Sequence, residues 1–124
     1  MDQSILLTIR SMIGGDEEYS ASDPFVIELI IHINTVLGIL NQLGIGVEGF
    51  AITGSTETWS DFIGESPVSL NEVQSYVFLR VQLLFDPPTS SVLLQAKTDM
   101  INELTWRMTT KVEVTNCRQT EAMT

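Results

Sequence analysis

The sequence predicts an all-α fold: a small bundle of about four helices, with a short hairpin or extended loop between the second and third helices and an extended C-terminal tail. Apolar residues recur at helical spacing in most segments, and glycine and proline residues separate these segments. The chain has 124 residues, 44% of them hydrophobic, which suffices for one domain with a modest core. We therefore assign residues 1–110 to a helical domain and residues 111–124 to the tail.

The first predicted helix runs from about Ser4 to Ile13. Gly14 and Gly15 end it, because glycine readily adopts the left-handed backbone that closes many helices. Residues 16–22 form a polar, acidic connector to the next helix. No targeting signal is visible, since the apolar run at residues 5–7 is too short for the core of a signal peptide, and we expect a cytosolic protein.

The second helix has the strongest start signal in the sequence. Asp23 can cap the free amides, and Pro24 stands at the first helical position, where its missing N–H costs nothing. We expect this helix to reach Leu43 and to stop at Gly44, a length of about 20 residues or roughly 30 Å. It is apolar nearly all round, apart from one narrow polar stripe made by Glu28, His32, Thr35 and Gln42.

Such an apolar helix has two interpretations. Either it is the central helix of the domain, or one of its sides packs against another subunit. The stretch is also long enough to test as a membrane span. Its polar residues are costly in hydrocarbon and it lacks basic flanks, so we expect a buried helix of a soluble protein.

The segment between the second and third helices is rich in glycine. Residues 44–54 contain four glycines and alternate in hydropathy, which predicts a short hairpin or a mobile extended loop. The segment could adapt to a partner or be a plain surface loop. From Thr56 to Ile63 we expect one or two helical turns that carry Trp59 and Phe62 into the core.

Two further helices complete the domain. Ser69 and Glu72 match a capping box at the start of the third, which ends at Phe85 because a proline pair follows Asp86. The fourth helix is capped by one of residues 89–91 and runs from Val92 to about Thr109. Its apolar stripe consists of Leu93, Met100, Ile101, Leu104 and Met108.

The sequence offers little for catalysis or for binding ions. Glu28 and His32 share a helix face, but no third metal ligand is evident, and Cys117 has no nearby histidine. We predict no catalytic, cofactor-binding or metal-binding residue, and we do not expect an enzyme. Sixteen acidic against six basic residues give a net charge of −10, which disfavours binding to nucleic-acid phosphates and to anionic membranes.

Two side chains are candidates for contacts between subunits. Trp106 lies opposite the apolar stripe of its helix, so it either anchors a second subunit or is covered by the loop or the tail of its own chain. Arg80 lies within an apolar segment, where an unpaired charge is costly. We expect a carboxylate partner for it, either within the chain or across a subunit boundary.

Four phrases of the sequence resemble those of a known family. In chain order they are ILLTIRSMIGGDEEYSASDPFVIELIIHINTVLGILNQLG, ETWSDFIG, SYVFLRVQLLFDPPTSSVLLQA and INELTWRM. With them the chain resembles the small head–tail connector (adaptor) proteins of long-tailed bacteriophages of Gram-positive bacteria, in the gp6-like connector group. The resemblance covers about residues 3–110, and YVFLRVQLLFDPPTSS is its most specific part.

The resemblance implies a structural protein of the virion neck, made in the host cytoplasm, without catalytic activity or cofactor. It implies a homo-oligomeric ring, a dodecamer, beneath the portal protein. The ring would extend the DNA channel, without binding DNA specifically, and would dock the next head-completion or tail-completion protein. The C-terminal segment would engage the portal, and we name Val112, Val114 and Asn116 as candidates for that contact.

We expect six side chains at the contacts between subunits: Trp106, Arg80, Ile27, Ile30, Ile31 and Leu37. The acidity of the chain would let a DNA duplex slide through a channel, although from charge alone solubility is the better explanation. Two other functions stay open: another small virion assembly protein such as a tail-completion factor, and a small helical regulator that binds a host protein. Location within the particle separates the first from a connector, and absence from virions would favour the second.

Overall fold

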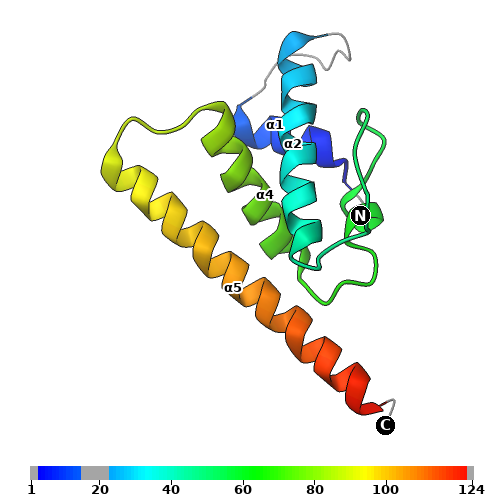
Figure 1. The fold of residues 1–124 in the computed structure, drawn as a ribbon. Helices are drawn as coiled ribbons and strands as arrows, with labels where there is room; N and C mark the ends of the chain where they lie inside the picture. The colour runs from blue at the N-terminus through cyan, green and yellow to red at the C-terminus, as the bar shows by residue number, and fades with distance from the viewer. Residues whose placement is uncertain (1–2, 15–22, 123–124) are drawn as a thin grey trace.

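The computed structural model describes residues 3–14 and 23–122, with side chains described up to residue 115. Within these ranges the chain forms helices and no strand, and one isolated bridge joins Ser4 to Thr58. The all-α prediction is therefore confirmed (Figure 1). The helices are α1 (Ile5–Ile13), α2 (Pro24–Gln42), α3 (Trp59–Ile63), α4 (Leu70–Phe85) and α5 (Ser91–Ala122). The expected connector at residues 16–22 and Gly15 lie outside the described residues.

Helix α2 is the central helix, as one of the two interpretations of its sequence predicts. It begins as expected, because Asp23 Oδ1 accepts a hydrogen bond of 3.0 Å from the Phe25 amide and Pro24 occupies the first turn. It packs against α1 and α4. By length and composition α2 could cross a membrane. Six of its side chains instead lie in the protein core: Val26, Leu29, Ile33, Val36, Leu37 and Leu40.

The segment from Gly44 to Thr58 is an extended loop, not a hairpin. Two asparagines of α2 hold it against the bundle. Asn34 exchanges hydrogen bonds with the backbone of Ile52, and Asn41 bonds the backbone of Ile45, Val47 and Gly49. The sequence predicts this loop but gives no sign of its anchoring, because an asparagine on a helix does not reveal a distant partner.

Short helix α3 turns the loop back into the core. Trp59 and Phe62 are buried, as predicted. Thr58 and Asp61 form a reciprocal capping box at its start, and the Trp59 indole nitrogen donates a hydrogen bond of 3.3 Å to the Thr8 hydroxyl of α1. Helix α3 is therefore tied to α1.

Helices α4 and α5 form an antiparallel pair. Ser69 accepts a hydrogen bond of 3.2 Å from the Glu72 amide at the start of α4, as the capping box predicts. Ser90 caps α5 by accepting a bond of 3.3 Å from the Leu93 amide. Lys97 on α5 donates a hydrogen bond to Gln82 on α4.

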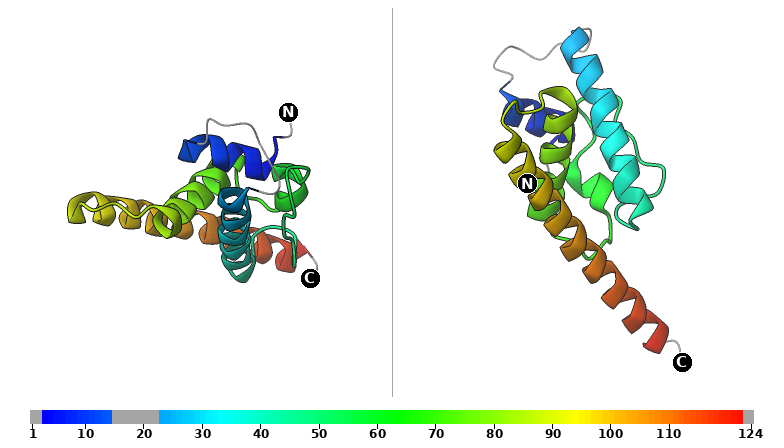
Figure 2. Two further views of the ribbon diagram at one scale, coloured as in Figure 1. Left: turned by 90° about the horizontal axis from the view of Figure 1, so that it is seen from above. Right: turned by 60° about the vertical axis from the view of Figure 1, so that its left-hand side comes forward.

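The expected end of the last helix near Thr109 and the extended tail after it are wrong. Helix α5 continues to Ala122, because no glycine or proline interrupts the sequence and because its later turns still contact the bundle. Lys111 pairs with Glu72, and Val112 packs against the core. Both ends of α5 project past the other helices (Figures 1 and 2).

The predicted apolar stripe of α5 is only partly a core stripe. Ile101 and Met108 are buried and Leu104 is partly buried, as expected. Leu93 and Met100, however, are about half exposed. Leu93 is exposed because the first turns of α5 diverge from the end of α4 (Figure 1), whereas Met100 lies at the edge of the side of α5 that carries the buried Ile101.

Candidate functional site

The described residues contain no group of three or more histidine, cysteine or acidic side chains that could hold a metal ion. The pair formed by His32 and Glu28 lies 3.5 Å apart between Nε2 and Oε1, with no third ligand. The side chain of Cys117 lies outside the described residues. Exposed apolar side chains and an uneven distribution of charge are prominent features of the described residues.

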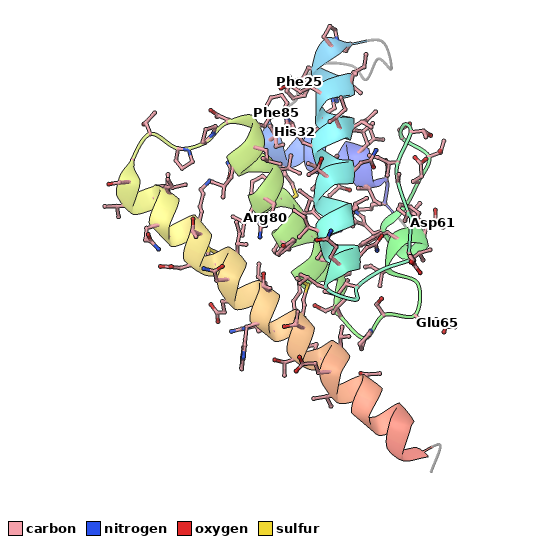
Figure 3. All side chains as sticks on the ribbon, viewed as in Figure 1. Phe25, His32, Asp61, Glu65, Arg80 and Phe85 are labelled. Carbon is pink, nitrogen blue, oxygen red and sulfur yellow. The ribbon has the colours of Figure 1, made fainter. Side chains whose placement is uncertain are left out.

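The charge of the chain is divided unevenly between its parts. Residues 1–90 contain twelve acidic and two basic side chains, whereas α5 contains four of each. The entire net charge of −10 therefore belongs to the part of the chain before α5. Asp61 and Glu65 belong to this acidic part and lie at the edge of the bundle opposite the start of α5 in Figure 3.

The first turns of α5 expose an apolar surface. Val92 is 78% exposed and Met100 is 52% exposed, and the neighbouring Leu93 and Ala96 are exposed as well. Val92, Ala96 and Met100 are spaced four residues apart and so share one side of the helix. We call Val92, Leu93, Ala96 and Met100 the α5 stripe. Exposed, contiguous apolar surface of this kind marks an interaction site.

A second apolar surface lies on α2. Ile27 and Ile31 are 49% and 59% exposed and point away from the core, and Ile30 beside them is half-buried. Leu37 is fully buried in the core of its own chain, so its expected role in a subunit contact must be corrected. The error follows from the pattern of α2, whose nearly continuous apolar surface does not reveal which side faces inward.

Trp106 is 68% exposed. Neither the loop nor any other described segment covers it. Around it lie polar groups, including the ion pair between Arg107 and Glu103 at 2.6 Å. A large exposed indole surrounded by polar side chains is typical of an interaction hot spot.

Arg80 is half-buried on α4 and bonds to a tyrosine. Its Nε donates a hydrogen bond of 3.1 Å to the Tyr76 hydroxyl, and its guanidinium carbon lies 5.3 Å from the centre of that ring. No carboxylate among the described residues forms an ion pair with it, so the carboxylate expected within the chain is not found there. The tyrosine satisfies the Nε donor and offers its ring face to the charge, which is why burial is tolerated.

An aromatic cluster joins α2 to the end of α4 (Figure 3). The rings of Phe25 and Phe85 meet edge to face with centroids 4.9 Å apart, and His32 meets Phe85 at 5.8 Å. The pattern of residues along the chain does not predict this cluster. The spacing of Phe25 and His32, seven residues apart on one side of a helix, is the only signal for it. The cluster packs the first half of α2 against the last residue of α4.

The residues predicted to dock the portal lie on the last turns of α5. Val112 is half-buried, and a Cβ at Gly44 would lie 3.4 Å from its Cγ1. Val114 is exposed, whereas the side chain of Asn116 lies outside the described range. Lys111 donates a hydrogen bond to Glu72. These contacts attach the first part of this segment to the bundle.

The Glu72 carboxyl is the partner that fixes this end of α5. Burial by itself raises the pKa of Glu72, but hydrogen bonds from Lys111 and Ser69 and the charge of Lys111 outweigh it, so the pKa lies below its ordinary value of 4.5. The carboxylate is therefore ionised at neutral pH. It acts as a structural ion-pair partner between α4 and α5.

Comparison with known proteins identifies the family. Residues 5–115 match the family described as Phage connector protein. No curated protein and no solved structure matches the chain. The match begins with α1 and ends at residue 115 within α5, so it includes all or part of each of the five helices. It confirms the resemblance to a phage head–tail connector that was drawn from the sequence. The chain belongs to the phage connector protein family.

Proposed function

We propose that this connector protein assembles as a homo-oligomeric ring, a dodecamer, beneath the portal of the virion. In this role it extends the DNA channel and docks the next head-completion or tail-completion protein, without catalysis or cofactor. The family match over residues 5–115 carries the proposal. The exposed apolar surfaces of α2 and α5 support it, because a monomer gains nothing from leaving them in water.

Ring assembly would use the exposed side chains. Ile27, Ile31 and Trp106 are available for contact with neighbouring subunits, and Ile30 lies at the margin of the same α2 surface. Leu37 is not available for such a contact, because it is buried in the core of its own chain. Arg80 remains a candidate for the contact between subunits. Tyr76 satisfies only part of its hydrogen-bonding capacity, and a carboxylate of a neighbouring subunit can still pair with its charge.

The division of charge supports a role around DNA. An acidic surface repels the phosphates of a duplex, so a channel wall of this kind lets DNA pass without holding it. The acidic part of the chain would then line or approach the channel. Helix α5, whose acidic and basic residues are equal in number, would suit contacts with other proteins.

The last turns of α5 would dock the portal. They project from the bundle as a helical arm, and Val114 is exposed on it. Val112 is used by the chain itself through its contact with the core, so Val114 and Asn116 are the stronger candidates for the portal contact.

Electron microscopy of lysates tests the proposal. The parent phage with this gene deleted is expected to accumulate DNA-filled or leaked heads beside separate, complete tails. Supplying the intact gene from a plasmid should restore joined particles. Intact tailed particles in the deletion lysate would show that the protein is dispensable for joining and would overturn the proposal.

A further inference from the structure

We infer that the α5 stripe of one copy packs on the exposed side of α2, at Ile27 and Ile31, in the next copy of this chain. The inference rests on the proposed ring and states which two surfaces close it. A cyclic ring needs two different surfaces on each subunit, one for each neighbour. This chain exposes two such apolar surfaces on helices that are far apart in the sequence.

The first observation is that both surfaces are uncovered. Val92, the most exposed apolar side chain of the stripe, lies in the first turn of α5. On α2, Ile31 points away from the core. An ideal Cβ at Gly38, two turns further along α2, meets no atom within 4 Å. The α2 surface is therefore open along its length to an approaching helix.

The second observation is that the two surfaces have matching geometry. Val92, Ala96 and Met100 form a ridge of residues spaced four apart, and Ile27, Ile31 and Thr35 form another. Ridges of this spacing interdigitate when two helices cross at about −50°, the commonest packing between helices. The absence of a side chain at Gly38 lets the crossing helix come close.

The third observation concerns charge and selects a second copy as the occupant. Copies that carry −10 each repel one another unless they meet where charge is low. Helix α5 is neutral in total, and α2 carries Glu28 as its one acidic residue. Both surfaces therefore lie on helices of low net charge, where like-charged copies can meet with little repulsion. Each copy also supplies both surfaces in equal number, as a head-to-tail ring requires.

Disulfide trapping between single-cysteine variants tests the inference. Cys117 is first replaced by serine, so that the full chain has no other thiol. Val92→Cys is then made in one preparation and Ile31→Cys in another, one of them labelled with ¹⁵N. The two are mixed at high protein concentration in about 1 M NaCl, where charge repulsion is screened within about 3 Å, and oxidised with copper phenanthroline.

A head-to-tail contact predicts a disulfide-linked dimer of mixed mass, several-fold more abundant than either homodimer. Pairs of Val92→Cys with Leu7→Cys, and of Ile31→Cys with Val114→Cys, are matched controls, because Leu7 and Val114 are also exposed. Homodimers of Val92→Cys in place of mixed dimers would indicate a two-fold contact and overturn the inference. Mixed dimers no more abundant than in the control pairs would overturn it as well.

The test is separable from that of the proposed function. If the trapping fails while the deletion phage still accumulates unjoined heads and tails, the connector role stands and the ring closes through other surfaces. Should the trapping succeed while the deletion phage makes intact particles, the chain self-associates through these surfaces but is not needed for joining. The first result overturns the inference alone, and the second overturns the proposed function.

Discussion

The Asn34 side chain on α2 bonds to the backbone of Ile52 in both directions, 18 residues further along the chain. Its Nδ2 donates to the Ile52 carbonyl at 3.0 Å, and its Oδ1 accepts from the Ile52 amide at 2.8 Å. Ile52 is buried, so this pair closes the loop over the core. The loop that the sequence suggests to be mobile is in fact held at this point by a complete pair of hydrogen bonds.

Replacing Asn34 by alanine should therefore destabilise the fold. Both backbone groups of Ile52 would lose their partners, a loss worth about 1–3 kcal/mol for each buried group left unsatisfied. Urea denaturation followed by circular dichroism measures the change. Thr35→Ala is the matched control, because Thr35 is exposed on the same helix. Equal stabilities for the two variants would show that the Asn34 bonds do not hold the loop.

Gly46 and Gly49 should respond differently to alanine. Both have positive φ, of 84° and 75°, so each substitution costs about 1–2 kcal/mol of backbone strain. At Gly46 the new Cβ would also collide with the Phe62 ring, whereas at Gly49 no atom lies within 4 Å. Gly46→Ala should therefore have a clearly lower midpoint in thermal denaturation than Gly49→Ala. Similar midpoints would contradict the close packing of the loop on α3.

Replacing Trp106 by alanine should separate folding from assembly. The side chain is exposed, so the free energy of unfolding should change by less than about 0.5 kcal/mol. Joining of heads to tails in the deletion phage supplied with this variant should nevertheless fall sharply. Asn102→Ala, on the same exposed side of α5, is the control and should restore joining. Normal joining with Trp106→Ala would remove Trp106 from the proposed contacts.

Ionic strength should act on self-association in a defined direction. Copies that carry −10 each repel one another, and salt screens this repulsion. Sedimentation velocity should therefore show larger species as NaCl is raised from low concentration toward about 1 M. The Ile31→Ser variant should show a much smaller increase. Dissociation with rising salt would instead indicate contacts dominated by ion pairs.

Acid should weaken the attachment of α5 through Glu72. Because the pKa of Glu72 is lower in the folded chain than in the unfolded chain, its contribution is fully present above the unfolded value near 4.5 and is lost as pH falls through the folded pKa. Glu72→Gln should be less stable than the natural chain at pH 7, with the difference shrinking below pH 4.5. Urea denaturation at pH 7 and at acid pH measures this, and a pH-independent difference would contradict the assignment.

Elements whose signals are local could be predicted from the residues alone. The Asp23–Pro24 start of α2 and the Ser69 cap of α4 act within one turn of helix, so the residues that create them also reveal them. The position of Trp106 opposite the core follows from helical spacing alone in the same way. The family resemblance, too, rests on phrases that are visible without a structure.

Features that depend on residues distant in the chain could not be predicted without the folded structure. The fold turned Leu37 inward and Ile31 outward on a helix that is apolar all round. Helix α5 continues beyond the expected end at Thr109, because Lys111 pairs with Glu72 and Val112 packs against the core. Both features depend on packing between helices. Because packing energy depends on which surfaces meet, the pattern along one segment cannot predict them.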